Sequence, residues 1–257
     1  KRYSLTPPDI DARVRIVVGD FSKPAFGLSA ELYQQLAAEV DVIYHNGADF
    51  NLALSYAALR ATNVGGVIES LKLAVATRTK PVHLVSTFAV HTTAENRGQL
   101  VTEEDPIQPF EKQLYGYTQT KWVGEKLVLE ARQRGIPVTM YRPGHITGDS
   151  ITGASNTNDL LHTLVIICLR LGAAPLRDVE LDVTPVDYVA KALVELSFQP
   201  ESINGDFHLT NPIPMRTRAL NEWMRLANLD LEMVSYDEWR DRLLKMGNEM
   251  GIGDIRR

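Results

Sequence analysis

The chain has 257 residues, of which 44% are hydrophobic and 23% are charged, and its formal net charge at pH 7 is −5. This composition is typical of a globular protein, and an acidic balance with scattered basic residues argues against a nucleic-acid-binding surface. No apolar run is long enough to cross a bilayer, so no membrane partner is expected.

Segments typical of strands and of helices alternate along the first part of the chain, which is the pattern of a parallel α/β sheet. Short apolar runs rich in β-branched residues predict strands at residues 14–19, 42–45, 82–85 and 138–141. Periodic stretches bounded by capping or breaking residues predict helices at residues 29–39, 59–76 and 118–134.

The alternation loosens after Pro143. The later segments predict helices at residues 159–171 and 187–197, a short strand at residues 206–209, and two helices around residues 231–235. We therefore expect an α/β fold with a doubly wound parallel sheet in residues 1–150. Residues 151–257 are expected to form a smaller α+β lobe, part of which returns to the sheet.

One connection is longer than a compact domain usually needs. Residues 94–113 are polar and contain Pro106 and Pro109. Loops of this kind are usually functional lids or disordered segments. Because this loop leads directly to Tyr117, we favour a lid.

Tyr117 and Lys121 lie at the start of a predicted helix, and a spacing of four residues puts them on one face. A nearby ammonium charge favours the phenolate, so the pair predicts a lowered pKa for Tyr117. Such a tyrosine can give a proton to a carbonyl group that is being reduced. By itself the pair also fits an exposed helix with a lysine one turn on.

The run of residues 81–85 supports the catalytic interpretation, since it is apolar and ends in two hydroxyl residues, Ser86 and Thr87. It predicts a buried parallel strand whose carboxyl end delivers both side chains to the ligand crevice of an open α/β sheet.

The single cysteine, Cys168, lies in an apolar helical stretch and is interpreted as a core residue. One cysteine allows no disulfide within the chain, which is typical of a reducing compartment such as the cytoplasm. The six histidines show no spacing typical of a zinc site, so no metal site is predicted.

Six short motifs occur in the order found in extended short-chain dehydrogenases/reductases. They are Gly19-Asp20-Phe21-Ser22, Tyr44-His45-Asn46-Gly47-Ala48, Asn63-Val64, Val85-Ser86-Thr87, the Tyr117/Lys121 pair and Tyr141-Arg142-Pro143-Gly144. Three longer stretches resemble thioester reductase domains, which terminate nonribosomal peptide synthetases, polyketide hybrids and carboxylic acid reductases. These stretches are residues 43–51 (IYHNGADFN), 116–127 (GYTQTKWVGEKL) and 181–197 (LDVTPVDYVAKALVELS).

The resemblance implies a Rossmann-like sheet, an NADP(H) cofactor and a substrate-binding C-terminal lobe. It implies that Thr87 hydrogen-bonds the substrate carbonyl, that Tyr117 gives the proton, and that Lys121 holds the cofactor ribose. Asn63 resembles a helix asparagine that supports a water-linked proton path in the family. Cofactor contacts are implied at Asp20, Phe21, Asn46, Gly47, Ala48, Asn63, Ser86, Lys121, Tyr141, Pro143, Gly144 and Ile146.

Some of these positions have a second interpretation from the residues alone. Asp20 also fits a turn aspartate bonded to its own backbone, and Asn63 fits a helix cap or a solvated amide. Asn46-Gly47 is also a common turn signal, and Pro143-Gly144 an ordinary strand exit.

The implied activity is the reductive release of a carrier-bound acyl or peptidyl thioester as an aldehyde, with an alcohol as the product of a second reduction. The implied partner is a phosphopantetheinylated acyl or peptidyl carrier domain within a larger multidomain synthetase. Two alternatives remain open: a sugar-nucleotide epimerase or dehydratase of the same superfamily, and a non-catalytic module of the same fold.

The sequence departs from the family in one large respect. It contains no GxxGxxG turn of the kind that cradles dinucleotide phosphates. We therefore expect that an N-terminal βαβ unit is missing, that the strand predicted at residues 14–19 lacks neighbours, and that these residues alone are inactive. A truly truncated, inactive protein is the alternative.

Overall fold

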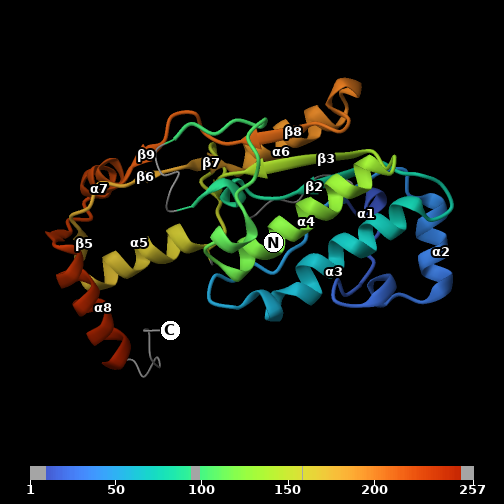
Figure 1. Cartoon of the computed structure of the whole chain (residues 1–257). Helices are drawn as coiled ribbons and strands as arrows, with labels where there is room; N and C mark the ends of the chain where they lie inside the picture. The colour runs from blue at the N-terminus through green and yellow to red at the C-terminus, as the bar shows by residue number, and fades with distance from the viewer. Residues whose placement is uncertain (1–9, 94–98, 158, 250–257) are drawn as a thin grey trace. The chain divides into compact units, whose positions relative to one another are not determined.

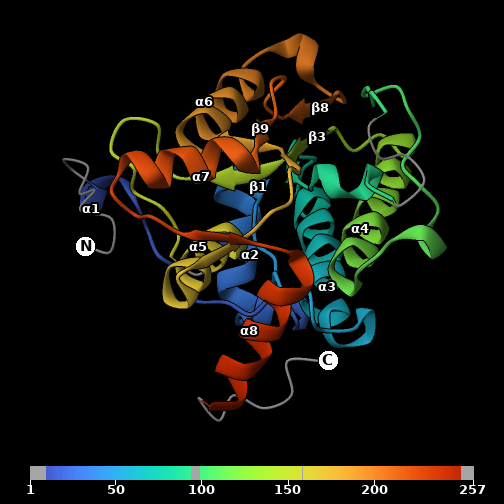
Figure 2. The same ribbon diagram turned by 90° about the vertical axis from the view of Figure 1, so that its left-hand side faces the viewer.

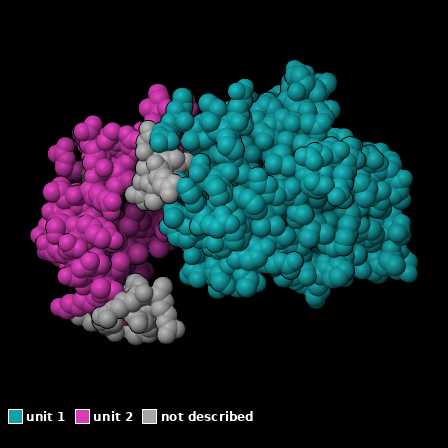
Figure 3. All heavy atoms as spheres, in the orientation of Figure 1, with its two compact units in different colours: residues 1–144, 188–210 teal, residues 145–187, 211–257 magenta. Residues whose placement is uncertain are grey.

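The computed structural model describes residues 10–93, 99–157 and 159–249. The chain divides into two compact units, which are coloured separately in Figure 3. The first comprises Lys1–Gly144 and Tyr188–Thr210, and the second comprises His145–Asp187 and Asn211–Arg257. Among the described helices, none combines the length and the apolarity that crossing a membrane requires.

In the described residues, the first unit is built on a four-stranded sheet with the strand order β1-β2-β3-β8. The strands are β1 (Ile43–His45), β2 (Val82–Val85), β3 (Val138–Pro143) and β8 (Asp206–Leu209). All neighbouring strands are parallel, and Ile43, Val82 and Val138 are aligned across the sheet. Every residue of β2 and β3 is buried, as expected for strands covered on both faces. The predicted α/β fold with a parallel sheet is confirmed.

Helices cover both faces of this sheet. The helices of the first unit are α1 (Ile10–Arg13), η1 (Pro24–Gly27), α2 (Ala30–Glu39), α3 (Tyr56–Val75), η2 (Phe88–His91), η3 (Phe110–Lys112), α4 (Gly116–Gln133), η4 (Pro200–Ser202) and most of α6 (Val186–Ser197). Figures 1 and 2 show α3 and α4 side by side on one face. Ser29 and Ser55 cap α2 and α3, each accepting a hydrogen bond from a backbone N–H three residues on.

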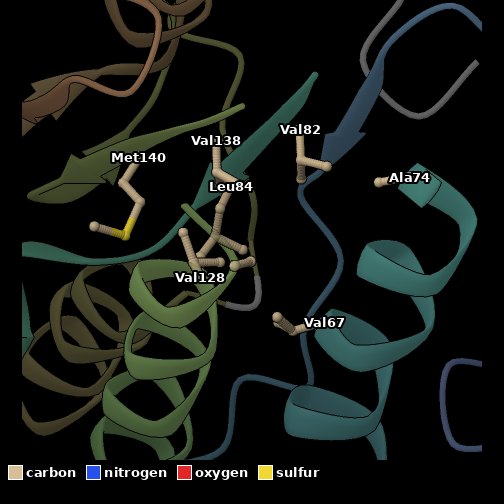
Figure 4. Close-up of a cluster of buried hydrophobic side chains, with 8 residues drawn as sticks. Val67, Ala74, Val82, Leu84, Val128, Val138 and Met140 are labelled. Carbon is tan, nitrogen blue, oxygen red and sulfur yellow. The ribbon is translucent and has the colours of Figure 1, made fainter. Parts of the chain in front are cut away.

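The main hydrophobic core lies between α3, α4 and the sheet, as Figure 4 shows. Its members are Val67, Ala74, Val82, Leu84, Val128, Ala131, Val138 and Met140. Tyr141, the next residue of β3, points to the opposite face, where it packs with Val189 of α6 and Leu209 of β8. Successive side chains of β3 therefore point to opposite faces of the sheet and contribute to two hydrophobic cores.

The second unit has its own smaller core, formed by Cys168, Ala173, Ala174, Val234 and Trp239. Its elements are β4 (His145–Thr147), α5 (Leu160–Leu171), β5 (Ala173–Pro175), β6 (Glu180–Leu181), β7 (Val183–Pro185), β9 (Met215–Arg216), α7 (Thr217–Leu226), β10 (Glu232–Val234) and α8 (Tyr236–Glu249). Strands β5 and β10 pair in parallel. Cys168 is buried in this core, as the sequence predicts.

The strand predicted at residues 14–19 is wrong. This segment has no regular structure, and the side chains of Val14, Ile16 and Val18 are 53%, 85% and 89% exposed. A strand needs a neighbour for its backbone groups, and no described strand pairs with this segment. The β propensity of these residues is therefore not sufficient to form a strand without a neighbouring strand.

The loop predicted to be a lid is only partly described, since residues 94–98 lie outside the described residues. Its later part is fixed at several points. The Gln113 side chain donates to the carbonyls of Val90 (2.9 Å) and Gln108 (3.1 Å), and the Trp122 indole N–H donates to Gln108 (2.8 Å). The lid function stays a prediction.

Candidate active site

The carboxyl ends of β1, β2 and β3 lie at one edge of the sheet, because the strands are parallel and in register. Residues 46–48 follow β1, Ser86 and Thr87 follow β2, and Pro143 ends β3. Open α/β sheets bind their ligands at this edge. The topology thus brings the candidate segments together as predicted for such a sheet.

Tyr117 is the second residue of α4, and Gly116 determines how this helix begins. A Cβ atom at Gly116 would lie 2.5 Å from the carbonyl oxygen of Leu54 and 2.5 Å from the nitrogen of Tyr56. Only glycine therefore lets the start of α4 approach the start of α3. The Tyr117 ring also packs edge-on against Phe50, with the ring centroids 4.9 Å apart.

Lys121 lies one turn further along α4. Its Nζ is 5.9 Å from the centroid of the Tyr117 ring and donates a hydrogen bond of 2.9 Å to the backbone carbonyl of Val85. This bond anchors the helix to the end of β2, two residues before Thr87. The predicted arrangement of Tyr117 and Lys121 on one helix face is confirmed.

The predicted effect of Lys121 on Tyr117 is not observed. Burial raises the pKa of Tyr117 to about 12, so its hydroxyl is protonated at neutral pH. Burial also lowers the pKa of Lys121 to about 8, and the nearby Glu125 carboxylate opposes that shift. The Lys121 ammonium binds the Val85 carbonyl, and it does not dominate the titration of the phenol.

Thr87 and Ser86 differ in what their hydroxyl groups contact. The Thr87 oxygen caps η2 by accepting from the Ala89 N–H (3.2 Å), and no described group accepts its own hydrogen. The Ser86 hydroxyl is buried and donates to the Glu125 carboxylate (2.5 Å). Thr87 therefore remains available to a ligand, whereas the Ser86 hydroxyl is used inside the protein.

Asn63, on α3, is buried and hydrogen-bonded through its whole amide. Its Oδ1 accepts from the Asp49 N–H (2.7 Å), and its Nδ2 donates to the Asp49 carbonyl and to the Thr120 hydroxyl oxygen (both 3.0 Å). The Thr120 hydroxyl donates to the Tyr117 carbonyl (2.7 Å). Asn63 thus joins the loop after β1 to the start of α4. The helix-cap and solvated-amide interpretations are wrong, and a role toward the cofactor stays a prediction.

Phe21 explains why residue 47 is a glycine. A Cβ atom at Gly47 would lie 2.2 Å from the Phe21 ring, and one at Gly66 would lie 3.1 Å from it. The same ring packs edge-on against His45, with a centroid distance of 5.3 Å. The absence of a side chain at position 47 therefore makes room for Phe21, while Asn46 and Ala48 on either side of Gly47 are exposed.

Asp20 has the geometry of a turn aspartate. Its carboxylate accepts hydrogen bonds from the hydroxyl (2.6 Å) and the N–H (2.9 Å) of Ser22, and these bonds lower its pKa. Its own N–H donates to the Phe26 carbonyl (2.7 Å). The turn interpretation is confirmed, and contact with a cofactor stays a prediction.

The structure places the Tyr141 ring in the core and away from the sheet edge. Its hydroxyl is hydrogen-bonded to Nδ1 of His83 (3.0 Å), and burial raises its pKa to about 12. Pro143 is buried at the end of β3, and the half-buried Gly144 donates its N–H to the Leu209 carbonyl (3.2 Å). Ile146 lies in β4, within the second unit.

A buried ionic network lies next to the candidate site and was not predicted. Glu125 of α4 binds Arg142 of β3 (2.9 Å), and Arg142 also binds Asp206 of β8 (3.1 Å). Asp206 binds Arg132 of α4 (2.5 Å). Two features of the sequence could have indicated this network: a glutamate four residues after Lys121 and an arginine inside an apolar strand.

A nicotinamide dinucleotide fits the donors at this edge of the sheet. The Lys121 ammonium keeps two hydrogens beyond the one given to Val85, which suits ribose hydroxyls. In the described part of the chain, the hydroxyls of Thr87 and Tyr117 also have no acceptor, which suits a carbonyl oxygen. The sequence offers no glycine-rich turn for the phosphates.

Residues 1–193 match the family model NAD_binding_4, described as Male sterility protein. A linear gramicidin synthase polypeptide of Brevibacillus parabrevis is 42% identical over 241 residues, which are 93% of this chain and 5% of that protein. This chain thus spans a small part of that relative's length.

Two solved structures are similar over most of the chain. The terminal R domain from the myxalamid PKS-NRPS biosynthetic pathway has a TM-score of 0.92 and 44% identity, covering 96% of this chain and 63% of that one. The reductase (R) domain of a nonribosomal peptide synthetase from Mycobacterium tuberculosis has a TM-score of 0.75 and 25% identity, covering 91% of this chain and 60% of that one.

Proposed function

Because this chain belongs to the NAD_binding_4 family, we propose that it serves the NADPH-dependent reductive release of a carrier-bound acyl or peptidyl thioester. The product is an aldehyde, and a second reduction gives an alcohol. Family membership establishes a nicotinamide cofactor, whereas the choice of NADP(H) is part of the proposal. The similar R domains confirm the resemblance to thioester reductases that the motifs indicate.

The similar proteins support the choice of partner. One belongs to a peptide synthase, and two are R domains of synthetase pathways. We propose that this chain likewise acts within a multidomain synthetase in the cytoplasm and receives its substrate from a phosphopantetheinylated carrier domain. The first unit would bind the cofactor, and the second would bind most of the substrate.

One observation carries the proposal: the Lys121–Val85 hydrogen bond joins the Tyr117/Lys121 helix to the strand end that leads into Thr87. Three hydrogen-bond donors from α4 and from the end of β2 thus belong to one edge of the sheet. This is the donor set that reduction of a carbonyl requires, since negative charge develops on the oxygen.

The chemistry follows from these donors. A nicotinamide cofactor held by Lys121 would supply the hydride that adds to the thioester carbonyl carbon. Thr87 and Tyr117 donate hydrogen bonds to the carbonyl oxygen, and these strengthen as its charge grows. With a pKa of about 12, Tyr117 holds its proton until the oxygen takes it. The resulting hemithioacetal loses its thiol, which leaves an aldehyde.

The proposal is tested by giving the full-length protein an acyl group on a phosphopantetheinylated carrier domain together with NADPH. NADPH oxidation and a trapped aldehyde in equal amounts are the expected result. UDP-sugars are offered in parallel, and turnover of these without thioester reduction would favour the epimerase or dehydratase alternative. NADPH binding measured by fluorescence, with no turnover of either substrate, would favour a non-catalytic module.

A further inference from the structure

Glu125 is the most deeply buried carboxylate next to the candidate site, with no exposed surface. It accepts three hydrogen bonds from the Arg142 guanidinium, at 3.1 and 3.2 Å from Nε and 2.9 Å from Nη2. A fourth comes from the Ser86 hydroxyl at 2.5 Å. The carboxylate therefore joins α4, β3 and the residue that follows β2.

Two of these connections reach the proposed catalytic residues. Ser86 immediately precedes Thr87, and its N–H also donates to the Tyr141 carbonyl (2.7 Å). Lys121 lies one helical turn before Glu125, and the Glu125 charge supports its protonated form. Among the described residues, the Val85 carbonyl, His45 of β1 and the Tyr117 ring also interact with this ammonium.

We propose that Glu125 is a positioning residue for the reduction: through Ser86 it fixes the strand end that carries Thr87, and on α4 it places a carboxylate one helical turn from Lys121. This inference rests on the proposed function. It adds a fourth side chain to the set of Thr87, Tyr117 and Lys121, and the full burial of Glu125 indicates that it acts through these residues.

The network is not what stability alone would select. Replacing a buried ion pair by well-packed apolar residues is often neutral or stabilising. Here Nη1 of Arg142 is buried and has no partner among the described residues. An unsatisfied buried donor carries a cost, so stability alone does not account for the pairing of Glu125 with Arg142.

The decisive experiment compares Glu125→Gln with the wild type in the full-length protein, using the carrier-bound thioester. We expect kcat to fall about 10- to 100-fold, because Thr87 is less well positioned. Activity also requires a charged Lys121, so it falls as pH rises through the pKa of this lysine. Loss of the Glu125 charge lowers that pKa, so the alkaline limb of the pH–rate profile should move to lower pH.

A matched control is Glu69→Gln, which makes the same change at a buried glutamate of α3 that binds Lys72. This variant should leave the alkaline limb of the pH dependence of kcat unchanged. Ser86→Ala provides a second test that leaves the Glu125–Arg142 pair intact. It should lower kcat without moving the limb, and wild-type kcat in this variant would overturn the positioning of Thr87 through Ser86.

The titration of Lys121 can also be followed directly, by NMR of the lysine-labelled protein. This readout does not depend on turnover, so it separates the two proposals. If the wild type reduces no carrier-bound thioester, the proposed function fails, while the lysine titration still decides the effect of Glu125. An unchanged Lys121 titration in Glu125→Gln would overturn that effect.

Discussion

The ammonium group of Lys121 donates a 2.9 Å hydrogen bond to the backbone carbonyl of Val85, the last residue of β2. This bond fixes a half-buried lysine to the strand end that leads into Thr87. Two further hydrogens of the ammonium remain for a ligand. One side chain therefore holds the helix against the strand and also carries the positive charge of the candidate site.

Tyr117→Phe is expected to abolish reduction in the full-length protein and to leave NADPH binding nearly unchanged. Loss of a positioned general acid typically costs about 10²–10⁴-fold in rate. Turnover and cofactor titration measure the two effects separately. Tyr115→Phe is the matched control, since Tyr115 is exposed next to α4 and should keep its activity. Wild-type-like turnover by Tyr117→Phe would contradict the assignment of Tyr117 as the proton donor.

Lys121→Ala is expected to weaken both NADPH binding and turnover, because the proposed function gives the ammonium the cofactor ribose and because the ammonium binds the Val85 carbonyl. Binding isotherms and steady-state kinetics together test this double role. Lys126→Ala, on the exposed side of the same helix, is the control and should change neither. A purely catalytic defect with unchanged cofactor affinity would contradict the prediction.

Lys80→Met is expected to reduce stability by about 2–4 kcal/mol. The Lys80 side chain is fully buried, and its ammonium donates to the carbonyls of Leu73 (3.2 Å), Ala76 (2.6 Å) and Arg78 (3.0 Å) at the end of α3. Urea unfolding monitored by circular dichroism measures the loss. Lys72→Met removes an exposed lysine of α3, and equal losses in both variants would contradict the explanation.

His45 is expected to make the protein acid-sensitive. Burial, together with the Lys121 charge, lowers its pKa from 6.5 to about 4. Between these values the unfolded chain binds a proton that the folded chain does not. Stability therefore falls as pH drops from 6.5 toward 4, by about 3 kcal/mol at the lower end.

Urea unfolding at several pH values tests this linkage. His45→Gln should reduce the acid slope of the unfolding free energy, and burial of His91, which lowers its pKa to about 4 as well, should account for part of the remainder. Ser70→Ala is the control, because it removes the hydrogen-bond partner of His45 (2.9 Å) and keeps the titrating ring. An unchanged slope in His45→Gln would assign the acid sensitivity to other groups.

A carrier-bound thioester is expected to be reduced with a higher kcat/KM than the same acyl group on coenzyme A. Tethering raises the effective concentration of the thioester, typically to about the millimolar range for short flexible links. Steady-state kinetics on matched substrates measure the ratio. Equal kcat/KM values on the two thioesters would contradict a role for the carrier domain and favour an acyl-CoA reductase.

The parts of the site that could be predicted are those that depend on local sequence. The spacing of Tyr117 and Lys121 fixes a shared helix face, and the apolar run before Ser86 and Thr87 fixes a buried strand. Parallel strands then bring their carboxyl ends together without further information. For this reason the sequence was sufficient for the fold class and for the edge of the sheet where the candidates meet.

The parts that could not be predicted depend on contacts between distant residues. Lysine is usually a surface residue, and only the fold shows that the Lys80 ammonium donates to three backbone carbonyls. The partner of Glu125 is an arginine on a different element. The contact between Phe21 and Gly47 likewise becomes visible only when two loops are brought together.

The segment of residues 14–18 also affects how the chain behaves in solution. It combines β-branched side chains with backbone groups that no described strand pairs, and β1 forms an edge of the sheet. Unpaired segments of this kind are templates for strand addition between molecules, and Arg15 is the single charge that interrupts this one. We therefore expect these residues to promote self-association when the chain is concentrated.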